Sequence, residues 1–174
     1  MDDNYIHFKI DGRDLKINKE TPEDIFMLRT HAGKYKMKNP KWNQIKVQTN
    51  EQGYKVIAIS PKKYRLHRVN YYAHNPDWDI HNSCIKTNSI DHRQGKNEIK
   101  KHQNNDINNL RIVTHQQNHF NRNCKGYCWD KQRQKWRAQI KGTNGKVKNL
   151  GRFNTEEEAR QSYLEAKKIY HKIE

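Results

Sequence analysis

The stretch that decides the fold in the middle of the chain reads NNDINNLRIVTHQQN, residues 104–118. Residues 110–113 are predicted to form a strand, since apolar and β-branched side chains gather there between polar segments. Thr114 follows, and Gln117 three residues later completes a capping-box pattern that predicts a helix over residues 115–122. Upstream, a short extended segment ends at Ile90. The predicted order is therefore strand, long loop, strand, helix.

The sequence before this region predicts several short elements. Alternating apolar residues around Asp11-Gly12 predict a hairpin over residues 4–17. Residues 21–24, Thr-Pro-Glu-Asp, combine a cap, a proline and acidic residues, so a short helix is predicted over residues 22–30. Further strands are predicted near residues 42–49 and 53–60, and a helix over residues 66–74.

The C-terminal third has the most regular pattern. Apolar and charged residues alternate over residues 135–141, which predicts a strand. A turn at Thr143-Asn144-Gly145 and a return strand over residues 146–153 follow. A second capping box over residues 155–158 begins an amphipathic helix. We expect three short strands and one helix here, within an α+β chain whose parts span residues 1–61, 62–122 and 123–174.

Composition restricts the class of partner. The 174 residues are 32% hydrophobic, with a mean hydropathy of −1.33, which favours small modules over one large core. The net charge is +16, from 35 Lys+Arg against 19 Asp+Glu. Residues 122–174 carry 14 Lys+Arg and 6 Asp+Glu, so a net +8, half of the total, lies there. This excess predicts a polyanionic partner, because neutralised phosphates release counterions; the alternative is merely solvated charge.

A membrane is not the expected partner. The sequence contains no run of about 20 apolar residues and no strong amphipathic anchor. Its first four residues, Met-Asp-Asp-Asn, are acidic and lack the apolar segment of a secretory signal.

Three cysteines, Cys84, Cys124 and Cys128, leave two interpretations open. One is a structural zinc site, to which Cys84 and His81 would add a second pair of ligands. The other is ordinary reduced thiols, which we favour because structural zinc usually requires four ligands in paired clusters.

One group of residues has the chemistry for phosphodiester cleavage. Such cleavage requires a base that activates water and a cation that neutralises charge on the phosphate and the leaving oxygen. A neutral histidine such as His92 can serve as the base near physiological pH. The carboxylate of Asp91 and the amide oxygen of Asn118 suit a hard divalent cation, with Mg²⁺ expected first, Mn²⁺ next and Ca²⁺ compatible.

Residues 66–121 resemble the HNH nucleases, in the branch found in phage and intron-encoded homing endonucleases. The resemblance implies a ββα-metal core with His92 as general base and Asp91 and Asn118 as ligands of one divalent cation. It implies that Asn109 orients the base or braces the loop, and that Arg68 lies near phosphate. Asn118 stands where the family often has histidine. The stretches that carry the resemblance are His67-Arg68-Val69 with Tyr72-Ala73, Ile90-Asp91-His92, residues 104–114, and Gln117-Asn118 with Asn121.

Two features complicate this assignment. The loop from His92 to Asn109 is long, so His102 or His115 is an alternative base or ligand. Adjacent residues on a regular strand also face opposite ways, so Asp91 and His92 can share one phosphate only at an edge or a bend.

Residues 123–171 resemble the ethylene-response-factor (Apetala-type) DNA-binding domain. The resemblance rests on Lys125-Gly126-Tyr127, Trp129-Asp130, residues 135–140, residues 150–153 and residues 155–159. It implies a three-stranded sheet in the DNA major groove with the helix packed behind. Arginine can contact guanine and glutamine can contact adenine there. The candidate DNA contacts are Arg133, Lys135, Arg137, Gln139, Lys141, Lys148 and Arg152, whereas Trp129 and Trp136 are expected to pack in the core.

The expected function is a site-recognising DNA endonuclease, of the mobile-element homing type, acting on double-stranded DNA. A monomer is expected and a dimer stays open. The location would be the cytoplasm of a bacterial or phage-infected cell, or wherever the target DNA lies. The role of residues 1–61 is open between DNA contact and scaffold. The alternatives are a restriction-type or repair-type HNH nuclease, a catalytically silent DNA-binding regulator and an RNA-binding protein.

Overall fold

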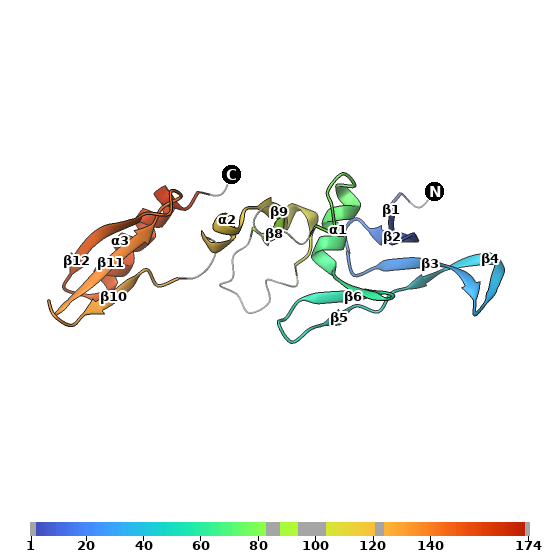
Figure 1. Ribbon diagram of the computed structural model, residues 1–174, viewed down its shortest axis with the longest axis horizontal. Helices are drawn as coiled ribbons and strands as arrows, with labels where there is room; N and C mark the ends of the chain where they lie inside the picture. Colours follow the sequence, from blue (N-terminus) through green and yellow to red (C-terminus); the bar gives the residue numbers. More distant parts are fainter. Residues whose placement is uncertain (1–2, 83–87, 94–103, 121–123, 173–174) are drawn as a thin grey trace. The chain divides into compact units, whose positions relative to one another are not determined.

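The computed structural model describes residues 3–82, 88–93, 104–120 and 124–172. Small antiparallel sheets and helices make up the described chain, as the predicted α+β class requires (Figure 1). Contacts divide it into two units, residues 1–84 with 90–112, and residues 85–89 with 113–174. Each unit is described by itself below. None of the helices within the described ranges is long and apolar enough to cross a membrane.

The first unit begins with a four-stranded antiparallel sheet in chain order. Its strands are β1 (Tyr5–Ile10), β2 (Arg13–Asn18), β3 (Ile25–Ala32) and β4 (Tyr35–Gln44). The predicted N-terminal hairpin is confirmed, with Asp11 and Gly12 both at positive φ in its turn.

The predicted helix over residues 22–30 is wrong, since most of that segment is strand β3. The Asn18 side chain accepts hydrogen bonds from the Glu20 and Thr21 amides, and the Asp24 amide bonds the Thr21 carbonyl. These polar residues therefore close a turn between β2 and β3. Ile25 is fully buried and pairs with Ile17 of β2. Burial of the apolar run against β2 outweighs the local helix signal.

A second sheet contains β5 (Gln48–Thr49), β6 (Lys55–Ile59) and β7 (Lys62–Arg65), and leads into α1 (Leu66–His74). The predicted turn near residues 50–53 is present, and the Asn50 side chain accepts from the amides of Gln52 and Tyr54. The predicted helix over residues 66–74 is confirmed. The strand predicted near residues 42–49 is divided between β4 and β5.

One hydrophobic core joins the N-terminal sheets to α1, so packing continues across the border that the sequence predicted at residue 61. Leu15 and Ile17 of β2 belong to the same buried cluster as Leu66 and Val69 of α1. The remaining buried members of the cluster are Ile10, Ile25, Ile57, Ile59, Tyr64, Ala73, Trp78 and Ile80.

The middle of the chain follows the predicted order of strand, loop, strand and helix. β8 (Ser89–His92) and β9 (Leu110–Val113) form a two-stranded sheet, with a short 3₁₀ turn, η2 (Ile107–Asn109), before β9. α2 (His115–Phe120) follows. Its capping box is confirmed, because the Thr114 amide donates to Gln117 Oε1 and the Gln117 amide donates to Thr114 Oγ1. The predicted last residues of this helix, 121 and 122, lie outside the described residues.

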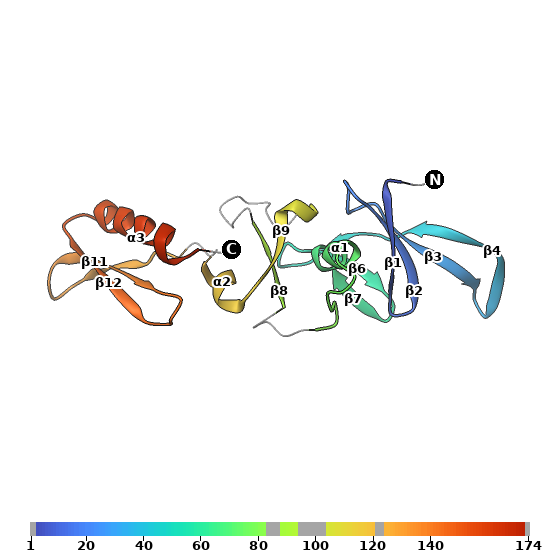
Figure 2. The same cartoon turned by 90° about the horizontal axis from the view of Figure 1, so that it is seen from above.

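The C-terminal part of the second unit has the predicted three strands and helix (Figure 2). β10 (Tyr127–Asp130), β11 (Lys135–Lys141) and β12 (Val147–Phe153) form an antiparallel sheet, followed by α3 (Glu156–Tyr170). A capping box between Thr155 and Glu158 begins α3. The helix covers one face of the sheet, where Ile140 packs with Tyr163 and Ala166.

Candidate functional site

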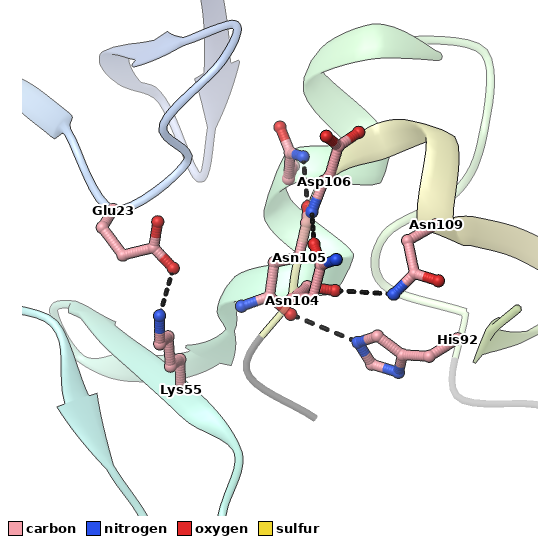
Figure 3. A network of polar contacts seen from close by, with 8 residues as sticks. Glu23, Lys55, His92, Asn104, Asn105, Asp106 and Asn109 are labelled. Atoms are coloured by element: carbon pink, nitrogen blue, oxygen red, sulfur yellow. Dashed lines mark hydrogen bonds and ion pairs between the residues drawn. The ribbon is translucent and has the colours of Figure 1, made fainter. Parts of the chain in front are cut away.

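A buried polar cluster surrounds His92 in the first unit. His92 ends β8 and is 8% exposed. Its Nε2 atom lies 3.2 Å from Oδ1 of Asn105 (Figure 3). The ring of His67, from the first turn of α1, meets the His92 ring edge to face at 5.1 Å between centroids. The predicted base is thus held between a loop amide and a second imidazole.

Helix α1 also fixes the loop that carries Asn105. The Asn70 Nδ2 atom donates to the Asn105 carbonyl at 2.7 Å, and both residues are buried. Asn70 Oδ1 and Asn105 Nδ2 are themselves buried and have no hydrogen-bond partner within the described part of the chain. An unsatisfied buried polar atom costs about 1–3 kcal/mol. Asn70 Oδ1 can therefore accept, and Asn105 Nδ2 can donate, one further hydrogen bond to a polar group that enters the cluster.

Asp91 occupies the position that the sequence assigned to a metal ligand, and its carboxylate has a cationic partner. Arg111 of β9 approaches Asp91 Oδ2 with Nη2 at 3.1 Å and with Nε at 3.3 Å. Asp91 is buried, so this ion pair neutralises a charge that burial alone would penalise. Arg111 was not predicted as a site residue from the sequence, although it lies on β9, the strand that pairs with β8.

Asp91 and His92 lie at the end of a short strand, next to a bend. Both residues belong to a short strand of a two-stranded sheet, and β8 ends at His92 with a bend at Arg93. Asp91 contacts Arg111 and His92 contacts Asn105. Both side chains are buried, and these two contacts involve different partners.

Asn109 has contacts that brace the loop. Its Nδ2 atom donates to the Asn104 carbonyl at 2.9 Å, and its own carbonyl accepts from the Arg93 amide at 2.7 Å (Figure 3). The direct contact with His92 comes instead from Asn105, which sequence reasoning did not select. Four asparagines lie between residues 104 and 109, and their spacing alone does not indicate which of them contacts the histidine.

Asn118, the second predicted metal ligand, lies on α2 in the second unit. Its pairing with Asp91 therefore stays a prediction. His115, named as an alternative base, is on the same helix, with its Nε2 atom 3.0 Å from that of His119. The other alternative, His102, lies outside the described residues.

The chemistry of the residues present fits a hard divalent cation. Within the described ranges, no group of three or more His, Cys, Asp and Glu side chains is arranged to hold a metal ion. A carboxylate and an amide oxygen are donors that suit Mg²⁺, which usually retains several water ligands. Asp91 already lies against the positive charge of Arg111. A divalent cation at Asp91 would therefore have to share this carboxylate with Arg111, whose positive charge opposes it.

Arg68, which the sequence places near phosphate, makes structural contacts within the first unit. Its Nη2 atom donates to the carbonyls of Ile80 at 2.9 Å and Asn82 at 3.1 Å, and its guanidinium lies 4.6 Å from the Trp78 ring centre. Burial lowers the pKa of Arg68 from its usual value, with a smaller effect from Arg65. These contacts hold the segment after α1 against the helix.

The sheet face opposite α3 gathers most of the predicted DNA contacts. Arg137 lies between Cys128 and Arg152 across the three strands, and Lys135 pairs with Asp130. Gln139 and Lys141 follow on the same side of β11, because side chains alternate along a strand. Arg152 Nε lies 3.3 Å from Asp130 Oδ2, which fixes one edge of the face. The open face thus contains Lys135, Arg137, Gln139, Lys141 and Arg152.

Two predicted contacts lie elsewhere. Lys148 pairs with Ile140 on the helix side of the sheet, and its amine bonds the Tyr170 hydroxyl. Arg133 lies exposed in the β10–β11 turn, where its amide donates to Asp130 Oδ1. The core prediction is wrong for Trp129, which is 40% exposed at the end of β10. Trp136 is half-buried and meets Trp129 edge to face.

The cysteines supply no zinc cluster within the described residues. Cys124 and Cys128 are both free and exposed, and Cys84 lies outside the described ranges. The choice between reduced thiols and a zinc site stays a prediction.

Comparison with protein-family models, with curated proteins and with solved structures finds no match to this chain. The case for function therefore depends on the chain's own residues. They provide a buried histidine held by an amide, an adjacent carboxylate balanced by arginine, and a separate sheet face with four cationic side chains.

Proposed function

We propose that the chain is a metal-dependent DNA endonuclease of the HNH type, with His92 as general base and Asp91 and Asn118 as ligands of one divalent cation. The hydrogen bond between His92 and Asn105 inside a buried polar cluster is the observation that carries this proposal. Histidine is an apt base because its ordinary pKa lies near physiological pH. An amide carbonyl against one ring nitrogen fixes both the tautomer and the orientation of that base.

His92 would remove a proton from water. With Nε2–H donated to Asn105 Oδ1, the basic nitrogen of the neutral ring is Nδ1. The hydroxide would attack phosphorus and the bond from phosphorus to the 3′ oxygen would break. The leaving 3′ oxygen would take a proton from solvent water, so the products carry a 5′-phosphate and a 3′-hydroxyl. The Oδ1 atom of Asn105 would also stabilise the imidazolium that forms, because it continues to accept a hydrogen bond from Nε2–H.

The divalent cation, Mg²⁺ or Mn²⁺, supplies positive charge for the phosphate and the leaving oxygen. Asp91 and Asn118 are the oxygen donors that would hold it. Arg111 orients the Asp91 carboxylate through the ion pair to Oδ2. Asn109 supports the same loop through Asn104 and Arg93.

The C-terminal sheet would bind the DNA. Its open face presents Arg137 and Gln139, side chains that can read guanine and adenine edges in the major groove. Arg137 Nε is buried without a hydrogen-bond partner within the described residues. Lys135 and Lys141 on the same face suit phosphate, so the C-terminal part would position DNA that is cut at His92.

The test is cleavage of long genomic DNA by the full chain with Mg²⁺ or Mn²⁺. We expect cutting that EDTA stops and that His92→Ala abolishes. His7→Ala is the matched control, since His7 is an exposed histidine on β1, outside the cluster around His92. Equal cutting by wild type and His92→Ala would contradict the assignment of the base.

A DNA-binding regulator without catalysis is the second candidate, because the basic sheet face supports binding independently of His92. It predicts tight, sequence-dependent binding with no cutting under any cation condition. Arg137→Ala would then weaken binding, whereas His92→Ala would leave it unchanged. The cleavage assay therefore separates the two candidates directly.

A further inference from the structure

Strands β3 and β4 extend beyond the rest of their sheet. β2 pairs with β3 only from Ile25 to Met27. Beyond Met27, β3 pairs with β4 alone, as far as Ala32 opposite Tyr35. We name residues 29–41 the basic arm; Figure 1 shows this hairpin projecting from the sheet of the first unit. The basic arm is therefore a two-stranded ribbon with no third strand beside it.

The hydrophobic core does not account for the basic arm. None of the residues between Phe26 and Gln44 belongs to the core cluster of this unit. Nearly all of β4 is exposed, and Tyr35 near the tip is 68% exposed. A hairpin that buries so little gains little stability from packing. Its sequence is therefore better explained by a contact with a partner.

Charge identifies the class of partner. The basic arm contains five cationic side chains and no carboxylate: Arg29, Lys34, Lys36, Lys38 and Lys41. Among the described residues, none of its four lysines forms an ion pair with a carboxylate. Other lysines of the same unit do, as in the pairs of Lys9 with Asp14 and Lys62 with Asp11. Uncompensated, close-spaced positive charge suits a polyanion.

Shape favours duplex DNA. The major groove of B-DNA admits a two-stranded β-ribbon. Alternation along β4 places Lys36 and Lys38 on one side of the ribbon and Tyr35 and Met37 on the other. We propose that the basic arm grips the phosphates of duplex DNA as a β-ribbon, separately from the C-terminal sheet. This inference extends the proposed function, since it assigns a DNA contact to a part of the chain that the nuclease proposal does not use.

The test is DNA binding by the full chain in EDTA, with a fluorescent duplex of mixed sequence. The arm variant combines Lys34→Gln, Lys36→Gln, Lys38→Gln and Lys41→Gln. The control variant makes the same change in charge with Lys9→Gln, Lys19→Gln, Lys62→Gln and Lys63→Gln, exposed lysines of the same unit. Because each phosphate contact contributes about 0.9 to the slope of log Kd against log salt, the arm variant should lower that slope by at least about 2. The control variant should keep the wild-type slope.

Three outcomes would overturn the inference. The first is an unchanged slope in the arm variant, and the second is an equal fall in the control variant. The third is loss of binding to a single-stranded RNA probe with duplex DNA binding retained, which would make RNA the partner. The arm variant could also aggregate while its monomer binds DNA as tightly as wild type. That result would overturn the inference as well, because the lysines would then only protect an edge strand from aggregation.

The assay also separates this inference from the proposed function. EDTA prevents metal-dependent cutting, so the binding result does not depend on whether His92 is a base. Suppose that the chain never cuts DNA but that the arm variant lowers the slope of log Kd against log salt. This result would refute the nuclease proposal and support DNA binding by the basic arm. Because the arm lies outside the core, circular dichroism and thermal unfolding of the variant should match wild type, which excludes misfolding as the cause.

Discussion

The Nε2 atom of His92 lies 3.2 Å from the Oδ1 atom of Asn105, although 13 residues separate them in the chain. The contact joins the end of β8 to the residues just before η2. Asn70 of α1 holds that loop through the Asn105 carbonyl. The orientation of His92 therefore depends on a helix that precedes it by about twenty residues in the sequence.

Asn105→Ala should lower the rate of DNA cleavage by roughly tenfold to a hundredfold, less than the full contribution of a general base. Without the amide carbonyl, the His92 ring loses the partner that fixes its tautomer. The pH profile of cleavage should shift as well, which a purely structural role would not produce. Asn108→Ala is the control, because Asn108 is exposed on the same loop. A variant at Asn105 with wild-type rate and profile would remove it from the site.

Arg111→Gln should destabilise the chain without divalent cation by about 2–4 kcal/mol, since it leaves the buried Asp91 carboxylate without its cationic partner. If Asp91 is a metal ligand, Mg²⁺ or Mn²⁺ should restore part of this loss, because a ligand that binds the folded state stabilises it. Urea unfolding with and without the cation measures both effects. Arg93→Gln, at an exposed residue next to His92, should change neither. Failure of both cations to restore stability would favour a structural ion pair.

Gly126→Ala should loosen the packing of α3 on its sheet. Gly126 has a φ of +67°, and an added Cβ would lie 2.1 Å from the Tyr163 ring. Gly145→Ala is the matched control, since its φ is +75° and nothing lies within 4 Å of the added carbon. Both variants incur the left-handed backbone strain of about 1–2 kcal/mol. Gly126→Ala adds overpacking of about 1–3 kcal/mol.

Hydrogen exchange of the β11 amides in the full chain measures this difference between the glycine variants. The amides should exchange faster in Gly126→Ala than in Gly145→Ala. Equal exchange would mean that Tyr163 moves aside without cost.

The bond between Tyr64 and Asp11 predicts a loss of stability at alkaline pH. The Tyr64 hydroxyl donates to Asp11 Oδ2 at 2.6 Å. Burial, with a further contribution from Asp11, raises the pKa of Tyr64 from 10 to about 12. Because the folded-state pKa is the higher one, this stability is fully present below pH 10 and is lost as pH rises toward 12.

Tyr64→Phe should therefore cost about 1 kcal/mol at neutral pH and flatten the dependence of unfolding free energy on pH above 10. Denaturant unfolding over that range is the measurement. Tyr35→Phe, at an exposed tyrosine near the tip of the basic arm, should keep the wild-type dependence. If the unfolding free energy of Tyr64→Phe falls as steeply above pH 10 as that of wild type, another group causes the alkaline loss of stability.

The sequence by itself determined the elements whose signals are local. The β10–β12 sheet with α3 follows from strict alternation, a Gly turn and a capping box between Thr155 and Glu158. Helix α1 and the order of β8, β9 and α2 were predictable for the same reason, as was the α+β class. Each depends on residues only a few positions apart, so no distant contact was required to predict it.

Only the tertiary structure decided which residues act on one another. Residues 22–30 carry a good helix start, yet burial of Ile25 against β2 makes most of them a strand, because long-range packing outweighs capping. Asn105, rather than a neighbouring asparagine, contacts His92, and Asn70 of α1 holds it there. Arg68 donates hydrogen bonds to the carbonyls of Ile80 and Asn82. Pairing of β9 with β8 brought Arg111 to Asp91. These are contacts between distant segments, and residue type and spacing along the chain do not specify them.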